Sequence, residues 1–374
     1  MSYEWRAVRD DDAPFAPRDG GGAIVFAGKM WLLGGWNPLP QYKEFFPRVC
    51  NGEIWCSADG SMWELVGHAP WEGRHCAGTV VHAGRMWVVG GDINQGHYQH
   101  DVWSSTNGLD WTCVCEEPPW GTPLGGRFSH YTVAFADHIW VIGGQNMAGM
   151  SSEYHSHSFQ LPDGETILHD DVWRTKDGRH WEQVADRCPW APRSAVGGSA
   201  VMGGKMWLVG GGTYDTPGRP ERLFYNDVWN SPDGVIWTCV SAHCLWEARQ
   251  YHEIAVWDDK LWVMEGYTPK TWVAPTGAGP FVSRTALDAG NRHGSGGNEE
   301  TPSVHYATTG ENSGNRNDCW YSEDGIKWHE VKGTPWARRH AASVFVFNDS
   351  LWMVAGNNMK ADVWQLRRRS KSRL

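Results

Sequence analysis

The chain has 374 residues, 41% of them hydrophobic and 20% charged, and its 33 basic and 43 acidic side chains give a net charge of −10. This composition is typical of a globular protein and excludes a disordered one. No apolar run approaches the roughly 18 residues of a membrane span, and the negative charge disfavours broad binding to nucleic-acid phosphates. We therefore expect no membrane or nucleic-acid partner, and we expect a monomer.

The first residues, "MSYEWRAVRDDDAPF", contain acidic side chains and no apolar core of a secretory signal, which predicts a cytoplasmic protein. Nine cysteines form no even framework with the spacing of secreted domains, so we expect reduced thiols. The basic tail at 367–374 is expected to be a solvated segment.

Six similar segments follow one another along the chain. Each contains an apolar run that ends in glycine, and these runs are "KMWLLGG", "RMWVVGG", "HIWVIGG", "KMWLVGG", "KLWVMEG" and "SLWMVAG". Short, β-rich runs ended by turn residues predict strands, and a second apolar stretch such as "GTVVHAG" precedes each run across a tight turn. Every segment is therefore expected to begin with two antiparallel strands.

A variable loop follows the glycines, and two further strands then carry one tryptophan each. The third-strand tryptophans are Trp55, Trp103, Trp173, Trp229, Trp320 and Trp364. The fourth-strand tryptophans, eight residues later, are Trp63, Trp111, Trp181, Trp237 and Trp328. Four antiparallel strands repeated in series predict the blades of a β-propeller.

The ring is expected to close through the N-terminus. The sixth segment ends at "ADVWQLRRR" with three strands, whereas "YEWRAV" has the pattern of a fourth strand, so Trp5 would complete the last blade. We predict an all-β, six-bladed β-propeller with four antiparallel strands per blade in one domain, 1–366. The expected blades are 14–70, 71–120, 121–190, 191–246, 247–336, and 337–366 together with 1–9.

The turn between the third and fourth strands is nearly the same in five blades, as in "SPDGVIW" and "STNGLDW". Asp-Gly or Asn-Gly supplies the positive φ of a tight turn, and the preceding Ser or Thr bonds the local backbone. A catalytic site is normally single, so this repetition predicts scaffolding.

These features together resemble the Kelch repeat: a glycine pair closing the second strand, an aromatic residue before it, a fourth-strand tryptophan and an arginine before the first strand. The resemblance covers 1–366, and the outer turn is similar to a shortened Asp-box of sialidase-type propellers. Glu265 and Ala355 depart from the glycine pair. The resemblance implies the superfamily of the galactose oxidase central domain, in which some propellers are sugar mutarotases and many are protein-interaction platforms.

Blade topology puts the loops between second and third strands on the same face as the connections between blades. Long insertions on that face, above all at 267–316, predict a binding surface there. An arginine enters each innermost strand at this face, and a ring of guanidinium groups would suit a carboxylate or phosphate. The alternative is that each arginine has a structural role, as a residue of the Kelch consensus, and bonds loop carbonyls or the acids flanking it. The ligand-binding candidates are Arg18, Arg74, Arg127, Arg193, Arg249 and Arg339, with Trp272 in the fifth-blade insertion.

Titratable residues beside these arginines differ between blades and are the catalytic candidates. The densest group is "RQYHE", 249–253, which combines a cation, a phenol, an imidazole and a carboxylate. Such groups could abstract a proton next to a carboxylate or move the anomeric proton of a sugar. The candidates are His75, His130, Tyr131, Tyr251, His252, Glu253 and His340. The alternative is that the histidines three residues after an arginine occupy a repeated structural position that caps backbone.

No cofactor is expected. His155 and His157 in the third-blade insertion could bind a metal with Glu153 or His169, but two histidines at that spacing do not define a site. "RQYH" resembles the copper-binding Tyr-His pair of galactose oxidase, yet Ser129 stands where that enzyme has a tyrosine.

Three functions remain open. The leading one is action on an acidic carbohydrate at the channel mouth by a mutarotase, epimerase or lyase, favoured by the arginines and the asymmetric titratable set. The second is a scaffold that binds an acidic protein segment through the same arginines. The third is a lectin-like binder without turnover. Fold alone does not choose among them.

Overall fold

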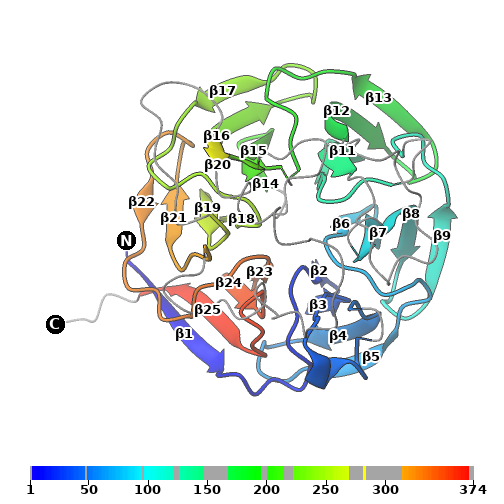
Figure 1. Cartoon of the computed structure of the whole chain (residues 1–374), viewed down its shortest axis with the longest axis vertical. Coiled ribbons are helices and arrows are strands. Elements are labelled where there is room, and N and C mark those ends of the chain that lie inside the picture. Colours follow the sequence, from blue (N-terminus) through cyan, green and yellow to red (C-terminus); the bar gives the residue numbers. More distant parts are fainter. Residues whose placement is uncertain are drawn as a thin grey trace, which may run out of the picture.

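A computed structural model describes residues 2–46, 49–94, 97–121, 126–146, 167–194, 200–213, 222–268, 281–283 and 314–369. These residues form six antiparallel sheets arranged in a ring, and the predicted six-bladed β-propeller is confirmed (Figure 1). The described part contains one 3₁₀ turn, Pro40–Tyr42, and no α-helix. Accordingly, no helix in it has the length and apolar character needed to cross a membrane.

Each sheet runs from an innermost strand beside the central channel to an outermost strand at the rim. Blade 1 contains β2 (Gly22–Phe26), β3 (Lys29–Leu33), β4 (Glu53–Ser57) and β5 (Glu64–His68). Blade 2 contains β6 (Gly78–His82), β7 (Arg85–Asn94), β8 (His97–Ser105) and β9 (Trp111–Cys115). Blade 3 contains β10 (Tyr131–Phe135), β11 (His138–Asn146), β12 (Ile167–Thr175) and β13 (Trp181–Ala185).

The second half of the ring follows the same order. Blade 4 contains β14 (Ala200–Met202), β15 (Lys205–Gly212), β16 (Arg222–Ser231) and β17 (Thr238–Ser241). Blade 5 contains β18 (Glu253–Trp257), β19 (Lys260–Met264), β21 (Cys319–Ser322) and β22 (His329–Glu330). Blade 6 contains β23 (Ser343–Phe347), β24 (Ser350–Val354), β25 (Val363–Arg368) and β1 (Tyr3–Arg9).

One strand was not expected from the sequence. β20 (Phe281–Ser283) belongs to the long segment between β19 and β21, yet it pairs antiparallel with the start of β16 in the preceding blade. Part of the fifth-blade insertion therefore returns to blade 4.

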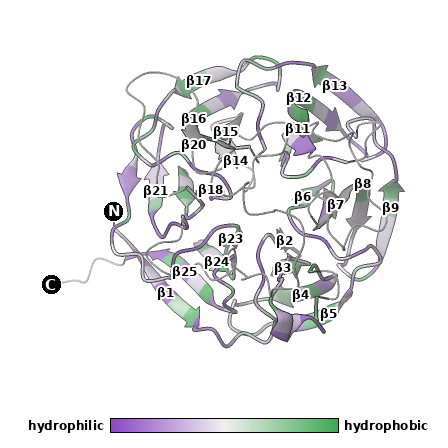
Figure 2. Cartoon of the chain, viewed as in Figure 1, coloured by the Kyte–Doolittle hydropathy of each residue, from purple (hydrophilic) through white to green (hydrophobic). Residues whose placement is uncertain are grey.

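The N-terminal strand closes the ring as predicted. β1 pairs antiparallel with β25, with Trp5 opposite Leu366 and Ala7 opposite Trp364. In Figure 1 β1 lies at the rim beside β25, where it covers an edge that would otherwise stay open. Outer strands such as β1 and β13 contain both hydrophilic and hydrophobic residues (Figure 2).

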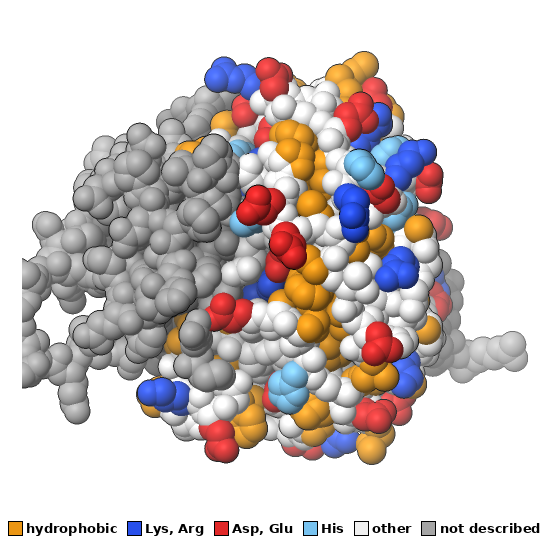
Figure 3. Space-filling view, turned by 90° about the vertical axis from the view of Figure 1, so that its right-hand side faces the viewer, with side chains coloured by type: hydrophobic (Ala, Val, Ile, Leu, Met, Phe, Trp, Pro, Cys, Tyr) orange, Lys and Arg blue, Asp and Glu red, His pale blue; other side chains and the backbone are white. Residues whose placement is uncertain are grey.

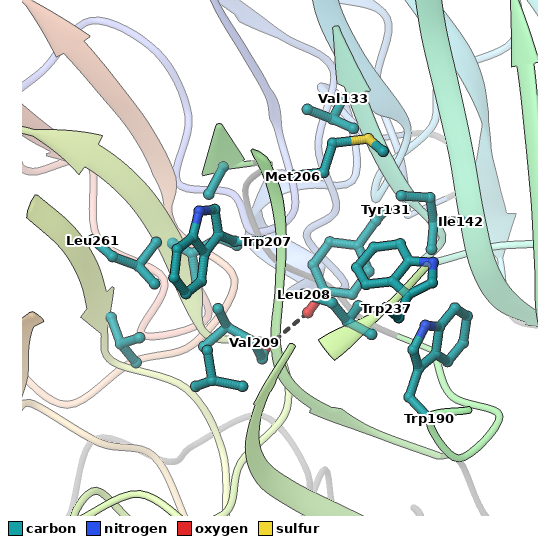
Figure 4. Packing of buried hydrophobic residues seen from close by; sticks show 14 of the residues in the cluster. Tyr131, Val133, Ile142, Trp190, Met206, Trp207, Leu208, Val209, Trp237 and Leu261 are labelled. Atoms are coloured by element: carbon teal, nitrogen blue, oxygen red, sulfur yellow. Dashed lines mark hydrogen bonds between the residues drawn. The ribbon is translucent and has the colours of Figure 1, made fainter. Parts of the chain in front are cut away.

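Aromatic side chains join each blade to the next. The connecting segment before each blade contributes an aromatic ring that packs edge-to-face on the fourth-strand tryptophan of that blade, as Trp190 does on Trp237 at 6.0 Å (Figure 4). The other pairs are Trp71 with Trp111, Trp120 with Trp181, Trp246 with Trp328, Trp336 with Trp5, and Phe15 with Trp63. Phe15 thus supplies in blade 1 the ring that tryptophan supplies elsewhere.

The outer turns are scaffolding, as their repetition predicted. The glycine of each turn packs on the second-strand tryptophan of the preceding blade, and a Cβ on Gly108 would lie 2.5 Å from Cη2 of Trp31. The neighbouring Asn107 accepts backbone N–H groups of the turn, and Ser105 accepts the N–H of Gly108 at 2.8 Å. The turn chemistry therefore also serves the contact between blades.

Gly108→Ala should destabilise the protein much more than Gly84→Ala. Both glycines have positive φ in tight turns of blade 2, but a Cβ on Gly84 meets nothing within 4 Å. We expect about 1–2 kcal/mol for the left-handed backbone at either site and roughly 1–3 kcal/mol more at Gly108 for overpacking against Trp31. Thermal unfolding of the two variants measures the difference, and equal losses would contradict this packing role.

Candidate ligand site at the channel mouth

Each of the six arginines is buried inside its blade. Arg339 is typical: its guanidinium donates to Asp362 at 2.6 and 2.8 Å and to the carbonyl of Ala355 at 2.7 Å. The acid also accepts the indole N–H of the tryptophan two residues later. The six ion pairs are Arg18–Glu53, Arg74–Asp101, Arg127–Asp171, Arg193–Asp227, Arg249–Asp318 and Arg339–Asp362.

This geometry favours the structural alternative for the arginines over an anion-binding ring. Their side chains are 0–3% exposed. Five of them make bidentate bonds to an aspartate, and Arg18 bonds Glu53 through one nitrogen and Asn51 and a backbone carbonyl through the other, so these bonds occupy the donors that a ligand would need. Burial raises the pKa of the Asp318 carboxyl, but the charge and hydrogen bonds of Arg249 outweigh it and hold that pKa below its ordinary value. The guanidinium groups therefore support the blades and do not line the channel.

Tyr131 and His252 also serve contacts between blades. The Tyr131 hydroxyl donates to the carbonyl of Val209 at 2.8 Å (Figure 4). Nε2 of His252 bonds the same carbonyl at 2.9 Å. Blades 3 and 5 thus both bind one backbone group of blade 4. Both side chains are buried, and burial lowers the pKa of His252 to about 3, which keeps the imidazole neutral.

His130 occupies the equivalent position in blade 3. It packs edge-to-face on Trp120 at 5.4 Å, and its Nδ1 bonds the Thr132 hydroxyl at 2.8 Å. Burial, together with the charge of Arg127, lowers the pKa of His130 to about 3. These contacts correspond to the repeated structural position that the sequence offered as the alternative to catalysis.

A belt of left-handed backbone lies at the channel mouth, at the residue two positions after five of the six arginines. The belt residues have φ between 52° and 57° and are Gly20, Cys76, Ser129, Tyr251 and Ala341. Neighbouring blades are joined here by backbone bonds from Cys76 to Gly20, from Gly20 to Ala341 and from Ala341 to Tyr251, each 2.8 Å. A left-handed conformation costs a non-glycine residue roughly 1–3 kcal/mol, so these bonds hold a strained ring of residues in place.

Polar and aromatic residues gather around this belt, and we call them the mouth cluster. The cluster consists of Asp19, Trp36, Cys50, His75, Asp92, Asn315, His340 and Asn357. Nδ1 of His340 bonds Asn315 at 2.6 Å, and the Asn357 amide donates to Asp19 at 3.0 Å. Blades 5, 6 and 1 are thereby linked by side chains at the mouth.

The cluster continues into blade 2. Trp36 stacks on His75 with ring centroids 6.1 Å apart, and Nδ1 of His75 bonds the Asp92 carbonyl at 2.9 Å. Burial lowers the pKa of His75 to about 4 and raises the pKa of Asp19 to about 7 despite the hydrogen bond from Asn357. His75 is therefore mainly neutral at pH 7, and Asp19 binds a proton more readily than an exposed aspartate.

Below the belt, the channel holds a cavity of about 370 Å³. Its wall is polar near the mouth, with Ser129, Thr132 and Ser343, and it becomes apolar further in, towards Val256 and Val346. Glu253 lies in this wall and is half buried. Of the predicted catalytic residues, Glu253 and His130 contribute to the cavity, His75 and His340 belong to the mouth cluster, and Tyr251 packs against His340 at 5.1 Å.

Sequence reasoning missed most of the mouth cluster and the acids that pair with the arginines. The sequence contains a signal for the acids and another for the mouth cluster. An Asp or Glu stands two residues before every third-strand tryptophan, and the residue directly after each glycine pair varies from blade to blade: Trp36, Asp92, Gln145, Gly212, Tyr267 and Asn357.

Some predicted residues lie outside the described residues, namely Trp272, His155 and His157. Within the described ranges, no three or more His, Cys, Asp or Glu side chains are placed to hold a metal ion. On the side of the ring seen in Figure 3, basic and acidic side chains are interspersed over the described surface.

Comparison with known proteins gives a fold but no family. No family model matches the chain, and no curated protein matches it. A solved structure described as "Structure of YjhT" is similar, with a TM-score of 0.60 and 15% identity over 94% of each chain. At this identity the likeness supports the propeller fold alone.

Arg339→Ala should destabilise the ring rather than abolish ligand binding alone. The substitution leaves Asp362 buried without its partner, and breaking such a pair costs about 3–5 kcal/mol. Arg367→Ala, which removes an exposed pair with Glu4, is the control and should cost less than about 1 kcal/mol. Denaturant unfolding measures both variants. If Arg339→Ala had wild-type stability but did not bind ligand, Arg339 would instead be a ligand-binding residue.

His252→Gln should make stability less dependent on pH. The pKa of His252 is about 3 in the folded protein, below the roughly 6.5 of an exposed histidine, so below pH 6.5 protons favour the unfolded chain. The stability contributed by a neutral His252 is present above pH 6.5 and is lost as pH falls towards 3. Between pH 6 and 4 the variant should lose about 1.4 kcal/mol per pH unit less than wild type. The exposed His329→Gln is the control, and identical slopes for all three proteins would contradict the assignment.

Proposed function

We propose that this propeller binds a carbohydrate at the mouth of its central channel and acts on it as a mutarotase or epimerase, with a lyase as a further option for the same site. The observation that carries the proposal is the mouth cluster, where the repeated blades stop resembling one another, directly above a cavity with Glu253 in its wall. Propellers host many functions, so the site and not the fold carries this choice.

The chemistry of the mouth suits a small polyhydroxylated ligand. Imidazole, amide and carboxyl groups from four blades lie close together at the mouth, where they are hydrogen-bonded to one another, and Trp36 stacks on His75. A volume of about 370 Å³ falls in the range of about 300–1,000 Å³ typical of small-molecule sites.

The arginines give no support to an acidic ligand, because all six are paired with carboxylates. Our proposal therefore covers neutral as well as acidic sugars. The alternative function, a scaffold that binds an acidic protein segment, was predicted from the same guanidinium groups. Because these groups are paired with carboxylates, they give no support to the scaffold either. The glycine pair with its buried arginine supports a Kelch-type assignment as part of this proposal.

A ligand screen tests the proposal. Neutral hexoses and pentoses, N-acetylated sugars, uronic and sialic acids, sugar phosphates and acidic peptides are compared by thermal shift, and NMR follows any hit for binding and turnover. We expect at least one free sugar to stabilise the protein and His75→Ala and His340→Ala to weaken its binding at least about tenfold, since each loses a polar contact in a desolvated site.

The control is His138→Ala, which changes the first residue of β11, next to the β10–β11 turn at the opposite face, and should leave binding unchanged. Stabilisation by acidic peptides alone would replace the carbohydrate proposal with the scaffold. Binding of a sugar without any turnover would make the protein lectin-like. The absence of a shift with every sugar would end the proposal.

A further inference from the structure

The belt at the channel mouth is interrupted between blades 2 and 3. Elsewhere the N–H of one belt residue donates to the belt carbonyl of the neighbouring blade, as from Cys76 to Gly20 and from Gly20 to Ala341, each at 2.8 Å. The belt residue of blade 3 is Ser129, with φ 53°. In the described part of the chain no backbone bond joins Ser129 to Cys76. The belt therefore uses neither the Ser129 N–H nor the Cys76 carbonyl.

The interruption is confined to the belt. Phe128, the residue before Ser129, exchanges backbone bonds of 3.1 Å with Gln145 inside blade 3. Deeper in the channel, a Cβ on Gly78 of blade 2 would overlap the Thr132 hydroxyl of blade 3, so the two blades are in direct contact there. Ser129 thus differs from the other belt residues although its blade is held in the same way.

The side chain of Ser129 is also without a partner. Its Oγ makes no hydrogen bond with any described residue, although Ser129 is only 2% exposed. An unpaired polar atom in a buried position is rare and costly. Glycine, which blade 1 has at this position as Gly20, would avoid this cost and the strain of the left-handed backbone. The serine therefore points to a role other than folding.

Both sides of the interruption face the cavity, since Ser129 and Cys76 both line it. Other hydroxyls of the wall are held by protein groups. The Thr132 hydroxyl bonds Nδ1 of His130 at 2.8 Å, and the Ser343 hydroxyl donates to a backbone carbonyl at 2.8 Å. Ser129 therefore offers two donors at the cavity, its N–H and its O–H, and Cys76 offers one acceptor, its carbonyl.

A sugar hydroxyl matches this set of groups. A hydroxyl carries one O–H donor and two acceptor lone pairs. Its oxygen can accept from both donors of Ser129 while its proton is donated to the Cys76 carbonyl. Such a hydroxyl satisfies the groups that the interrupted belt leaves over.

A carboxylate matches the set less well. It accepts hydrogen bonds but has none to donate when ionised, so the Cys76 carbonyl would stay unpaired beside a negative charge. The six arginines supply no compensating cation, because each of them is bonded to an acid.

We propose that Ser129 and the Cys76 carbonyl form a subsite that binds one free hydroxyl of the sugar, and that this subsite selects sugars with that hydroxyl over their deoxy and O-methylated forms. The inference rests on the proposed function of the mouth site. Ser129 is the specificity-determining residue, because its hydroxyl and its N–H both contact the ligand. The hydroxyl bridges blades 2 and 3 at the interruption of the belt.

The first test needs no sugar. Ser129→Ala keeps the Cβ and removes only the unpaired hydroxyl, so the midpoint of thermal unfolding should not fall. The matched control is Ser350→Ala on β24, another buried serine, whose hydroxyl accepts from the Gln365 amide at 2.9 Å. This control should lower the midpoint, because it leaves a buried donor unpaired. An equal fall in Ser129→Ala would show that its hydroxyl is bonded inside the protein and would overturn the inference.

The second test measures binding by isothermal titration calorimetry. The probes are glucose, galactose and mannose, with their uronic acids, followed by the monodeoxy and mono-O-methyl forms of the hexose that binds best. Ser129→Ala should bind that hexose at least about tenfold more weakly than wild type, while Ser350→Ala should bind it unchanged. Ser129→Gly, which has the residue of blade 1, should show the same loss and replaces the alanine variant if that variant does not fold.

The deoxy forms identify a direct contact. Removal of one particular hydroxyl should weaken binding to wild type at least about tenfold but binding to Ser129→Ala at most about threefold, since two groups in contact are coupled. Equal losses in both proteins for every deoxy form would overturn the inference. Tighter binding of a uronic acid than of its hexose, abolished by Ser129→Ala, would mean that the subsite takes a carboxylate and would overturn it too.

The outcomes separate this inference from the proposed function. Wild-type affinity of Ser129→Ala for a bound sugar would mean that the interruption holds water only, which overturns the subsite and leaves the carbohydrate site intact. Absence of binding by every sugar ends the proposed function and the subsite with it. The unfolding comparison still decides in that case whether the Ser129 hydroxyl is unpaired.

Discussion

A buried arginine holds every blade of this propeller to its own third strand. Its guanidinium bonds a carboxylate, the carboxylate accepts an indole N–H, and a carbonyl at the glycine pair accepts the remaining donor, as in Arg339, Asp362, Trp364 and Ala355. Because the arginine side chain runs across the second residue of that pair, a Cβ on Gly356 would lie 3.2 Å from its Cδ. Glycine is therefore retained there in all six blades, while Glu265 and Ala355 are tolerated one residue earlier.

This unit leaves the channel mouth free to vary. The arginine, the acid and the tryptophan satisfy each other's hydrogen bonds. The residues on either side of the arginine take no part in this hydrogen-bonded unit. The belt residues Cys76 and Tyr251 accept left-handed strain, and the mouth cluster differs in every blade. Strained backbone and non-repeating polar groups occur together at this end of the channel, as they commonly do at functional sites.

The fold could be predicted almost completely from the sequence, because strands and turns leave local patterns. Apolar runs, glycine pairs and Asp-Gly turns recur at short range, and "YEWRAV" carries enough of the pattern to assign β1 to the last blade. The short strand β20 could not be foreseen, since its pairing with β16 joins segments of different blades and has no local signal.

The candidate site was harder to predict, and the arginines show why. Their positions at the loop face were correct, but their availability depended on acids that lie 23 to 69 residues away in the chain. The sequence offers Tyr131 and His252 as candidate reactive groups, and only the structure shows that both bond one carbonyl in a neighbouring blade. By sequence, Glu265 is only a departure from the glycine pair. The structure shows that Ala342 of the next blade leaves room for its side chain.

The sequence by itself determined the number of blades, the order of strands, the ring closure and the structural role of the outer turns. These follow from hydrophobic periodicity and turn chemistry, which act over a few residues. Only the tertiary structure decided which polar groups are consumed by the scaffold and which face the channel. Whether a polar group faces the channel depends on its burial and on hydrogen-bond partners from other blades. The local sequence pattern of a strand carries no information on either.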